Sequence, residues 1–160
     1  MNKAVFLDRD GVINFDPGDY TFRQEDFKVL PYVGEALQDF SRKGYLLIVI
    51  SNQAGIARGF YGHDEVQALH VVLTEYAQQH GVRIEEVYYC PHYTKTGRCL
   101  CRKPDSLLIE KALARFGIQA DSSYFIGDKE RDMQAAKQVG VHGILVEPNV
   151  GLQHIIALVK

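Results

Sequence analysis

Residues 3–11 read KAVFLDRDG, and this stretch decides how the rest of the chain is interpreted. Its run of apolar residues predicts a strand that is covered on both faces, as in a parallel sheet with helices on either side. Two acids, Asp8 and Asp10, follow at once, and Gly11 allows the chain to turn sharply there. Such sheets bind ligands beyond the carboxyl ends of their strands, so both acids are candidate site residues.

The same strand signal recurs along the chain and alternates with helical patterns. Residues 45–51 (YLLIVIS) are the most continuous apolar run, and glycines stand where several helices are expected to end. We expect strands at residues 3–8, 45–51, 87–89, 123–128 and 143–146, and helices at 31–43, 64–80, 106–116, 130–139 and 152–159. This alternation predicts an α/β fold with a doubly wound parallel sheet, in which residues 1–160 form a single domain.

The composition is that of a globular protein of one-domain size: 160 residues, 46% hydrophobic and 24% charged. A formal net charge of -2 and the lack of a basic stripe argue against nucleic acid as a partner. No apolar run has the length of a membrane span, and residues 1–10 do not resemble a signal peptide. We therefore expect a cytoplasmic monomer that binds a small molecule, with no nucleic-acid or membrane partner.

Acids and hydrogen-bond donors follow three of the expected strands. Asp8 and Asp10 follow the first, Ser51 ends the second, and Asp128 ends the strand at 123–128. Clustered carboxylates repel one another unless a hard cation lies among them, and Mg²⁺ prefers oxygen ligands. A carboxylate is also a known nucleophile toward phosphorus. The pattern favours phosphoryl transfer, although each piece alone also fits an ordinary turn or helix cap.

Four segments, in this order, resemble the four motifs of the haloacid-dehalogenase superfamily of phosphatases: 8–12 (DRDGV), 51–53 (SNQ), 102–104 (RKP) and 127–132 (GDKERD). The resemblance implies a Rossmann-like fold and a phosphorylated intermediate on the nucleophile. The implied roles are Asp8 as nucleophile, Asp10 as general acid/base, Ser51 and Lys103 as phosphoryl ligands, and Asp8, Asp128 and the Asp10 carbonyl as magnesium ligands. Asp132 is expected to support the site instead of binding the metal.

Residues 90–101 form a loop with four soft or borderline metal ligands, namely Cys90, His92, Cys99 and Cys101. That is the number of ligands in a closed, structural zinc site. Ordinary buried thiols, or one disulfide with a cysteine left over, remain the alternatives. The loop runs directly into Arg102 and Lys103, so a bound zinc would fix the phosphate-binding lysine in space.

Within the superfamily, residues 90–92 (CPH) and 99–104 (CLCRKP) resemble the small branch of heptose-bisphosphate phosphatases and histidinol-phosphatases, which lack a large cap domain. Residues 51–59 and 14–20 resemble the heptose enzymes more. The implied substrate is D-glycero-D-manno-heptose 1,7-bisphosphate, which would lose its 7-phosphate. The implied substrate contacts are Asp16, Tyr20, Asn52, Gln53, Arg102 and Lys129.

Two alternatives stay open. The short segment between His92 and Cys99, and the residues DSLL at 105–108, are closer to histidinol-phosphatase. A catalytically silent module that binds a phosphorylated metabolite is the alternative of another class.

The sequence supports a separate expectation for each of four arginines. Arg102 is the first candidate to hold a second substrate phosphate, and Arg58 is a weaker one. Arg9 is expected to point away from the acids, because side chains alternate along extended backbone. Arg131 is expected to be part of a solvated helix start.

Overall fold

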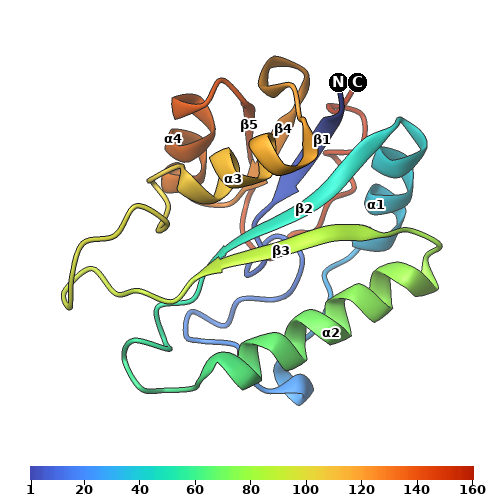
Figure 1. Cartoon of the computed structure of the whole chain (residues 1–160). Helices are drawn as coiled ribbons and strands as arrows, with labels where there is room; N and C mark the ends of the chain where they lie inside the picture. Colours follow the sequence, from blue (N-terminus) through green and yellow to red (C-terminus); the bar gives the residue numbers. More distant parts are fainter.

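The computed structural model describes residues 1–160. Five parallel strands form one sheet in the order β3-β2-β1-β4-β5, and helices cover both of its faces (Figure 1). The strands are β1 (Lys3–Leu7), β2 (Tyr45–Asn52), β3 (Ile84–Cys90), β4 (Tyr124–Gly127) and β5 (His142–Leu145). The α-helices are α1 (Val33–Arg42), α2 (His63–Gln79), α3 (Leu107–Phe116) and α4 (Glu130–Gln138), with short 3₁₀ turns at Gln24–Asp26 and Ala120–Ser122. The expected α/β class and parallel sheet are confirmed.

Alternating residues of the central strands feed two separate cores. Val5 and Leu7 of β1 pack with α1 and α2 on one face of the sheet. Ala4 and Phe6 pack with α3 and α4 on the other. Because both faces of β1 are buried, its apolar run has no polar alternation, which is the pattern that the sequence shows.

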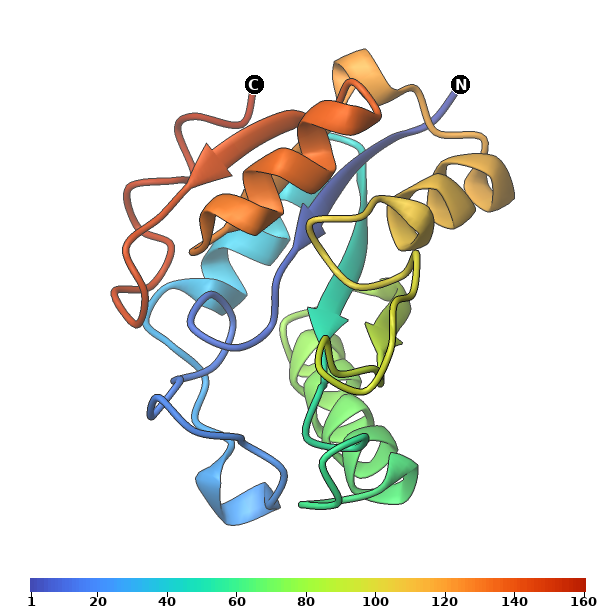
Figure 2. The same cartoon turned by 90° about the vertical axis from the view of Figure 1, so that its left-hand side faces the viewer.

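The sheet register brings the strand ends that carry polar residues to one edge. Leu7, the last residue of β1, is level with Val49 of β2 and with Ile126 of β4. The residues that follow these three positions therefore emerge close together. Figure 2 looks toward this edge, with the loop that precedes α3 on one side and the segment after β1 on the other.

The start of α2 differs from expectation. The helix was expected to begin at residue 64, but it begins one residue earlier, at His63, with Gly62 as its N-cap. The Glu65 carboxylate accepts a hydrogen bond from the Gly62 backbone N–H at 2.8 Å. Glu65 satisfies this free donor from the third helical position, so an acid in the first turn caps the helix and no side chain at the N-cap is needed.

The expected helix at 152–159 is wrong, since this segment forms only turns. Its spaced apolar residues, Leu152, Ile155 and Val159, pack into the core beside α1 and α2. The Lys43 ammonium donates to the carbonyls of Ile156 and Val159 at 3.1 and 2.6 Å. A segment this short gains little from helical hydrogen bonds, so these tertiary contacts determine its course.

None of the helices has both the length and the apolar character needed to span a bilayer.

Candidate active site

The centre of the site is a buried group of one ammonium and two carboxylates beyond the ends of β1 and β4. The Lys103 Nζ lies 2.9 Å from Asp8 Oδ1 and 2.8 Å from Asp132 Oδ1, and it donates to the Ile50 carbonyl at 2.7 Å. Lys103 is 1% exposed and Asp132 is 0% exposed, so water screens neither charge. Asp132 therefore serves as a counter-charge for the lysine, in keeping with the expected supporting role.

Charge sets the protonation of this group. Burial alone would lower the pKa of Lys103, but the Asp8 and Asp132 carboxylates raise it above its ordinary value. Burial raises the pKa of Asp8, the lysine offsets part of that rise, and Asp132 adds to it. Lys103 is therefore an ammonium, whereas a further positive charge near Asp8 would favour the ionised form of that carboxyl.

The residues present fit a magnesium ion. Carboxylate oxygens of Asp8, Asp128 and Asp132 all lie within 4.8 Å of one another. Asp128 is buried, and its Oδ1 has no hydrogen-bond partner. Burial, and then the charge of Asp8, raise the pKa of Asp128. An all-oxygen donor set with an unsatisfied buried oxygen is what a hard divalent cation requires.

Gly11 allows the Asp128 carboxylate to approach the turn after β1. The residue has φ +84°, and a Cβ built on it would lie 2.5 Å from Asp128 Oδ2. Any side chain here would displace Asp128 from Asp8. The glycine of the first motif is thus required by the second carboxylate of the site, a reason that only the tertiary structure reveals.

Asp10 is held by a hydrogen-bonded network that reaches the expected phosphoryl ligand Ser51. The buried Gln53 amide donates to Asp10 Oδ2 at 3.0 Å and to Ser51 Oγ at 2.8 Å. Tyr61 in turn donates its hydroxyl proton to Gln53 Oε1 at 2.6 Å. Asp10, Ser51 and Gln53 are therefore brought together as the sequence predicted, while Tyr61 was not foreseen because its position carries no motif.

The expectation that Arg9 points away from the acids is wrong. Its side chain is fully buried, and the guanidinium lies 3.0 Å from Asp10 Oδ1. The strand has already ended at Leu7, and the Arg9 carbonyl accepts the backbone N–H groups of a tight turn, among them that of Ile13 at 2.8 Å. Alternation along extended backbone therefore does not apply at this position.

A cavity of about 400 Å³ opens beside the carboxylates. Five of the predicted site residues lie on its wall, namely Asp10, Asp16, Tyr20, Asn52 and Lys129. Arg131 also lies there, half-buried in the first turn of α4, which begins at Glu130 as expected. Arg102 is not on this wall but lines another cavity of about 210 Å³, formed by the loop at 90–101 and the residues that follow it.

Arg58 also borders the cavity, yet aromatic rings and a hydroxyl already hold its guanidinium. The group lies over the rings of Tyr20, Phe60 and Tyr93, at 5.7, 4.9 and 5.0 Å from their centroids. It also donates to the Tyr20 hydroxyl at 3.1 Å. These contacts join three separate loops at the mouth of the cavity. The expected role of Arg58 as a phosphate donor thus competes with a packing role.

The four Cys/His side chains of the loop at 90–101 converge, as expected for a metal site. The Cys90 Sγ is 3.7 Å from Cys99 Sγ and 2.9 Å from Cys101 Sγ, and His92 Nδ1 lies 3.2 Å from Cys101 Sγ. Ligands around a tetrahedral zinc lie roughly 3.5–3.8 Å apart, a spacing that the Cys90–Cys99 pair has and that the two pairs with Cys101 fall short of. The number and chemistry of the donors, three thiols and one imidazole, fit zinc. All three cysteines are free, and the alternative of a disulfide is not found.

Asn52 connects this loop to the catalytic edge. Its side-chain amide donates to the Lys103 carbonyl at 3.1 Å, and the Lys103 N–H donates to Asn52 Oδ1 at 3.1 Å. At the other end of the loop, the Gln53 N–H donates to the Cys90 carbonyl at 2.8 Å. Asn52 and Gln53, at the end of β2, thus hold the chain on both sides of the loop at 90–101. Asn52, predicted as a substrate contact, has a clear structural task of its own.

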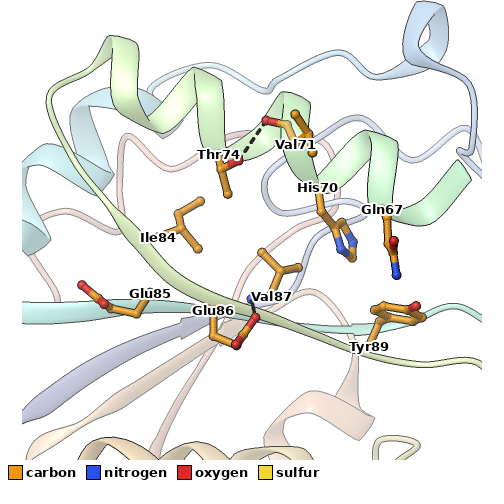
Figure 3. A pocket seen from close by; sticks show the side chains of 9 residues that line it. All are labelled: Gln67, His70, Val71, Thr74, Ile84, Glu85, Glu86, Val87 and Tyr89. Atoms are coloured by element: carbon orange, nitrogen blue, oxygen red, sulfur yellow. Dashed lines mark hydrogen bonds between the residues drawn. The ribbon is translucent and has the colours of Figure 1, made fainter. Parts of the chain in front are cut away.

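A separate groove of about 370 Å³ lies between α2 and β3 (Figure 3). Its floor is apolar, with Ile84 and Val87, and His70 and Tyr89 stand at one end. It holds none of the residues that the motifs single out. The candidate active site is therefore distinguished from this groove by its buried charged side chains.

Comparison with known proteins agrees with this geometry. A family model described as HAD-hydrolase-like matches residues 100–156. The D-glycero-beta-D-manno-heptose-1,7-bisphosphate 7-phosphatase of Haemophilus ducreyi is 40% identical over 149 residues, covering 87% of this chain and 79% of that protein. The D-glycero-alpha-D-manno-heptose-1,7-bisphosphate 7-phosphatase of Campylobacter jejuni is 39% identical over 145 residues, covering 90% and 81%.

A solved structure matches the fold over the same range. It is the D,D-heptose 1,7-bisphosphate phosphatase from B. bronchiseptica, complexed with magnesium and phosphate. The TM-score is 0.86 at 29% identity, covering 92% of this chain and 82% of that one. The chain therefore belongs to the haloacid-dehalogenase superfamily of phosphatases, in its branch of heptose-1,7-bisphosphate 7-phosphatases.

Proposed function

We propose that this phosphatase removes the 7-phosphate of D-glycero-D-manno-heptose 1,7-bisphosphate through a phosphorylated Asp8, with magnesium as its catalytic cation. The observation that carries the reaction is the position of Asp8, which is buried at the end of β1 with the Lys103 ammonium 2.9 Å away. The names of relatives about 40% identical support the substrate. We further infer that residues 1–160 act as one cytoplasmic, monomeric domain, with the zinc loop at 90–101 inserted into it.

In the first step, an Asp8 carboxylate oxygen attacks phosphorus and the bond to the sugar oxygen breaks. Asp10 gives a proton to that departing oxygen, so that a neutral alcohol leaves. Lys103 and the Ser51 hydroxyl donate to the phosphoryl oxygens as charge develops on them. A magnesium ion bound by Asp8, Asp128 and the Asp10 carbonyl would neutralise the repulsion between the carboxylate and the phosphate dianion.

In the second step, water attacks the phosphorus of the phosphorylated Asp8. The Asp10 carboxylate takes the proton of that water, and the bond between phosphorus and the Asp8 oxygen breaks. Inorganic phosphate leaves, and Asp8 and Asp10 return to their starting states. The same carboxyl group acts as acid and then as base, which requires that it be held close to the reacting oxygen in both steps.

The second phosphate of a bisphosphate needs its own donors. Lys129 and Arg131 lie on the wall of the cavity at Asp10, and Arg102 lines the cavity beside the loop at 90–101, with its Nη1 buried and unpaired. Guanidinium is well matched to a phosphate dianion. We infer that Arg102 and Lys129 contact the phosphate that is not transferred.

Histidinol phosphate remains a second candidate substrate because of two acids. Asp16 and Asp19 line the same cavity and suit a cationic amine. The Asn149 side chain fixes the Asp16 backbone, accepting from its N–H at 2.7 Å and donating to its carbonyl at 2.8 Å. Both acids therefore belong to an anchored loop at the cavity mouth.

We expect kcat/KM for heptose 1,7-bisphosphate to exceed that for histidinol phosphate at least about a hundredfold, since a site built for a charged group rejects a ligand that leaves it unpaired. Phosphate release with both anomers of the heptose and with histidinol phosphate measures this directly. A preference for histidinol phosphate would remove the heptose assignment and leave the reaction class untouched.

Arg102→Ala is expected to separate the two phosphates. Loss of a charge-assisted contact to the phosphate that is not transferred should lower kcat/KM for the bisphosphate by about 10- to 100-fold. Hydrolysis of 4-nitrophenyl phosphate, which lacks that phosphate, should change by less than about threefold. Arg42→Ala, at an exposed arginine at the end of α1, is the control. Equal losses on both substrates would place Arg102 at the transferred phosphate instead.

A further inference from the structure

Arg9 is the largest fully buried side chain of the molecule, with an exposure of 0%. A guanidinium is charged at any pH that a protein experiences, so its burial is costly unless a partner compensates it. No motif role and no step of the mechanism above explains why an arginine stands between the two catalytic acids. Its contacts supply a reason.

The Arg9 guanidinium forms an ion pair with one acid, Asp10. Arg9 Nη2 donates to Asp10 Oδ1 and Oδ2 at 3.0 and 3.1 Å, and Nε lies 3.3 Å from Oδ1. The same Nη2 also donates to the Thr21 carbonyl at 2.9 Å, which ties the grip to the backbone of another segment. Asp10 is the one acid that forms an ion pair with Arg9.

His70 adds no second charge near the Arg9 guanidinium. His70 of α2 stands at the end of the groove in Figure 3, and its Nε2 is buried without a partner. Burial, with a further contribution from the Arg9 charge, lowers the pKa of His70 to about 3, so the imidazole is neutral. The charge of Arg9 is therefore directed at Asp10 alone.

Two further donors complete the fixation of Asp10. The Asn14 amide donates to Oδ1 at 3.0 Å, and the Gln53 amide donates to Oδ2 at 3.0 Å. Oδ1 thus faces three N–H groups and Oδ2 faces two, while the side chain keeps 24% of its surface exposed toward the cavity. The carboxylate has a fixed orientation, and Oδ2 is the less heavily bonded oxygen.

We propose that Arg9 is a positioning residue for the proton transfers of Asp10: the geometry points to its buried, forked guanidinium as the group that aims the Asp10 carboxylate at the departing oxygen. This inference rests on the proposed function, in which Asp10 is the general acid/base. A lysine keeps the charge but cannot form the fork, because an ammonium is a point donor. Displacement of a reacting group by about 1 Å can lower a rate about a hundredfold.

Arg9→Lys tests the inference through leaving-group dependence. With glycerol 1-phosphate, a slow alkyl phosphate whose alkoxide needs a proton to leave, kcat/KM should fall about a hundredfold. With 4-nitrophenyl phosphate, whose phenolate leaves without one, kcat/KM should fall less than about fivefold. Water activation still needs Asp10, so the phosphorylated enzyme should accumulate and give a burst of 4-nitrophenolate, with kcat and KM lowered together.

Three controls make the result specific. Asp10→Asn should show the same contrast between substrates; if it does not, the general-acid role itself fails. In the Asp10→Asn background, Arg9→Lys should cause little further loss, since the two residues act as one unit. Arg83→Lys, at an exposed surface arginine, should leave both substrates unaffected. Thermal unfolding separates these effects from damage to the fold.

Equal losses of kcat/KM on both substrates, or wild-type values on both, would overturn the inference while the Asp10→Asn contrast stands. Should Arg9→Lys not fold, Arg9→Gln is the second variant, since a neutral amide can donate to one oxygen of the Asp10 carboxylate and brings no buried charge of its own. It must give the same contrast in kcat/KM between the alkyl and the aryl phosphate, and uniform loss in this variant counts equally against Arg9 as a positioning residue.

Discussion

Asp8→Asn is expected to lower kcat at least about a thousandfold while the protein remains folded, because an amide oxygen cannot replace a carboxylate as nucleophile toward phosphorus. The fold should tolerate the change well. Burial raises the pKa of the Asp8 carboxyl, so the site is not built to favour its charge. Lys103 also keeps the Asp132 carboxylate and the Ile50 carbonyl as partners.

Two measurements check this expectation. Phosphate release from 4-nitrophenyl phosphate with added magnesium reports turnover, and acid-quenched protein mass reports the phosphorylated intermediate. Asp26→Asn, at an exposed acid of the first 3₁₀ turn, is the matched control and should keep wild-type kcat. Turnover near the wild-type rate in Asp8→Asn would refute the nucleophile assignment, and the melting temperature shows whether the fold survived.

Removal of the zinc site is the second change with a large expected effect. We predict one zinc per chain, held by the three cysteines and His92, and retained through purification. Zinc-finger peptides gain about 10–16 kcal/mol of apparent free energy from their metal at pH 7, so a loop of this length should be disordered without it. Cys99→Ser should therefore release the metal and unfold the loop at 90–101.

The activity of Cys99→Ser should fall by about 10- to 100-fold without vanishing. Lys103 would lose the support of the zinc loop but keep its bonds to Asn52 and to the Ile50 carbonyl. Added magnesium should not restore the rate, because the two metals bind different donor sets. Metal content, hydrogen exchange of the loop and kcat/KM measure the three effects. Thr96→Ser, in the same loop but outside the cluster, is the control.

Two outcomes would contradict the zinc prediction. Wild-type protein that contains no zinc after purification under reducing conditions would remove the site. A disulfide among the cysteines, detected by mass spectrometry of the folded protein, would replace it. In either case the contacts of Lys103 with Asp8 and Asp132 would still support phosphoryl transfer, so the two predictions stand independently.

The sequence alone determined the α/β fold and which residues lie at the carboxyl edge of the sheet. Apolar runs that end in acids are buried strands, and the carboxyl ends of parallel strands meet in one crevice. The sequence was therefore sufficient to predict that Asp8, Ser51 and Asp128 lie close together. The four candidate metal ligands at 90–101 could be recognised from the sequence too, because they lie close in sequence and their donor chemistry is specific.

Only the tertiary structure decided what depends on contacts between distant segments. The apolar spacing at 152–159 predicted a helix, but packing against the core and the Lys43 ammonium outweighed the small helical gain of so short a segment. Arg102 and Lys129 both lie within recognisable motifs, yet they line different cavities, which the sequence did not predict.

Arg9 shows most clearly what the sequence alone could not predict. Its position in a strand-like pattern predicted a side chain turned away from the acids, whereas the strand ends at Leu7 and Arg9 lies in the turn that follows. Its partners, Asp10 and the Thr21 carbonyl, are fixed by that turn and by a loop that no local pattern describes. Local patterns determine which residues can do chemistry here, because strand burial and donor type are local properties. Long-range packing decides how they are aimed, because the orientation of a buried charge depends on all the segments that surround it.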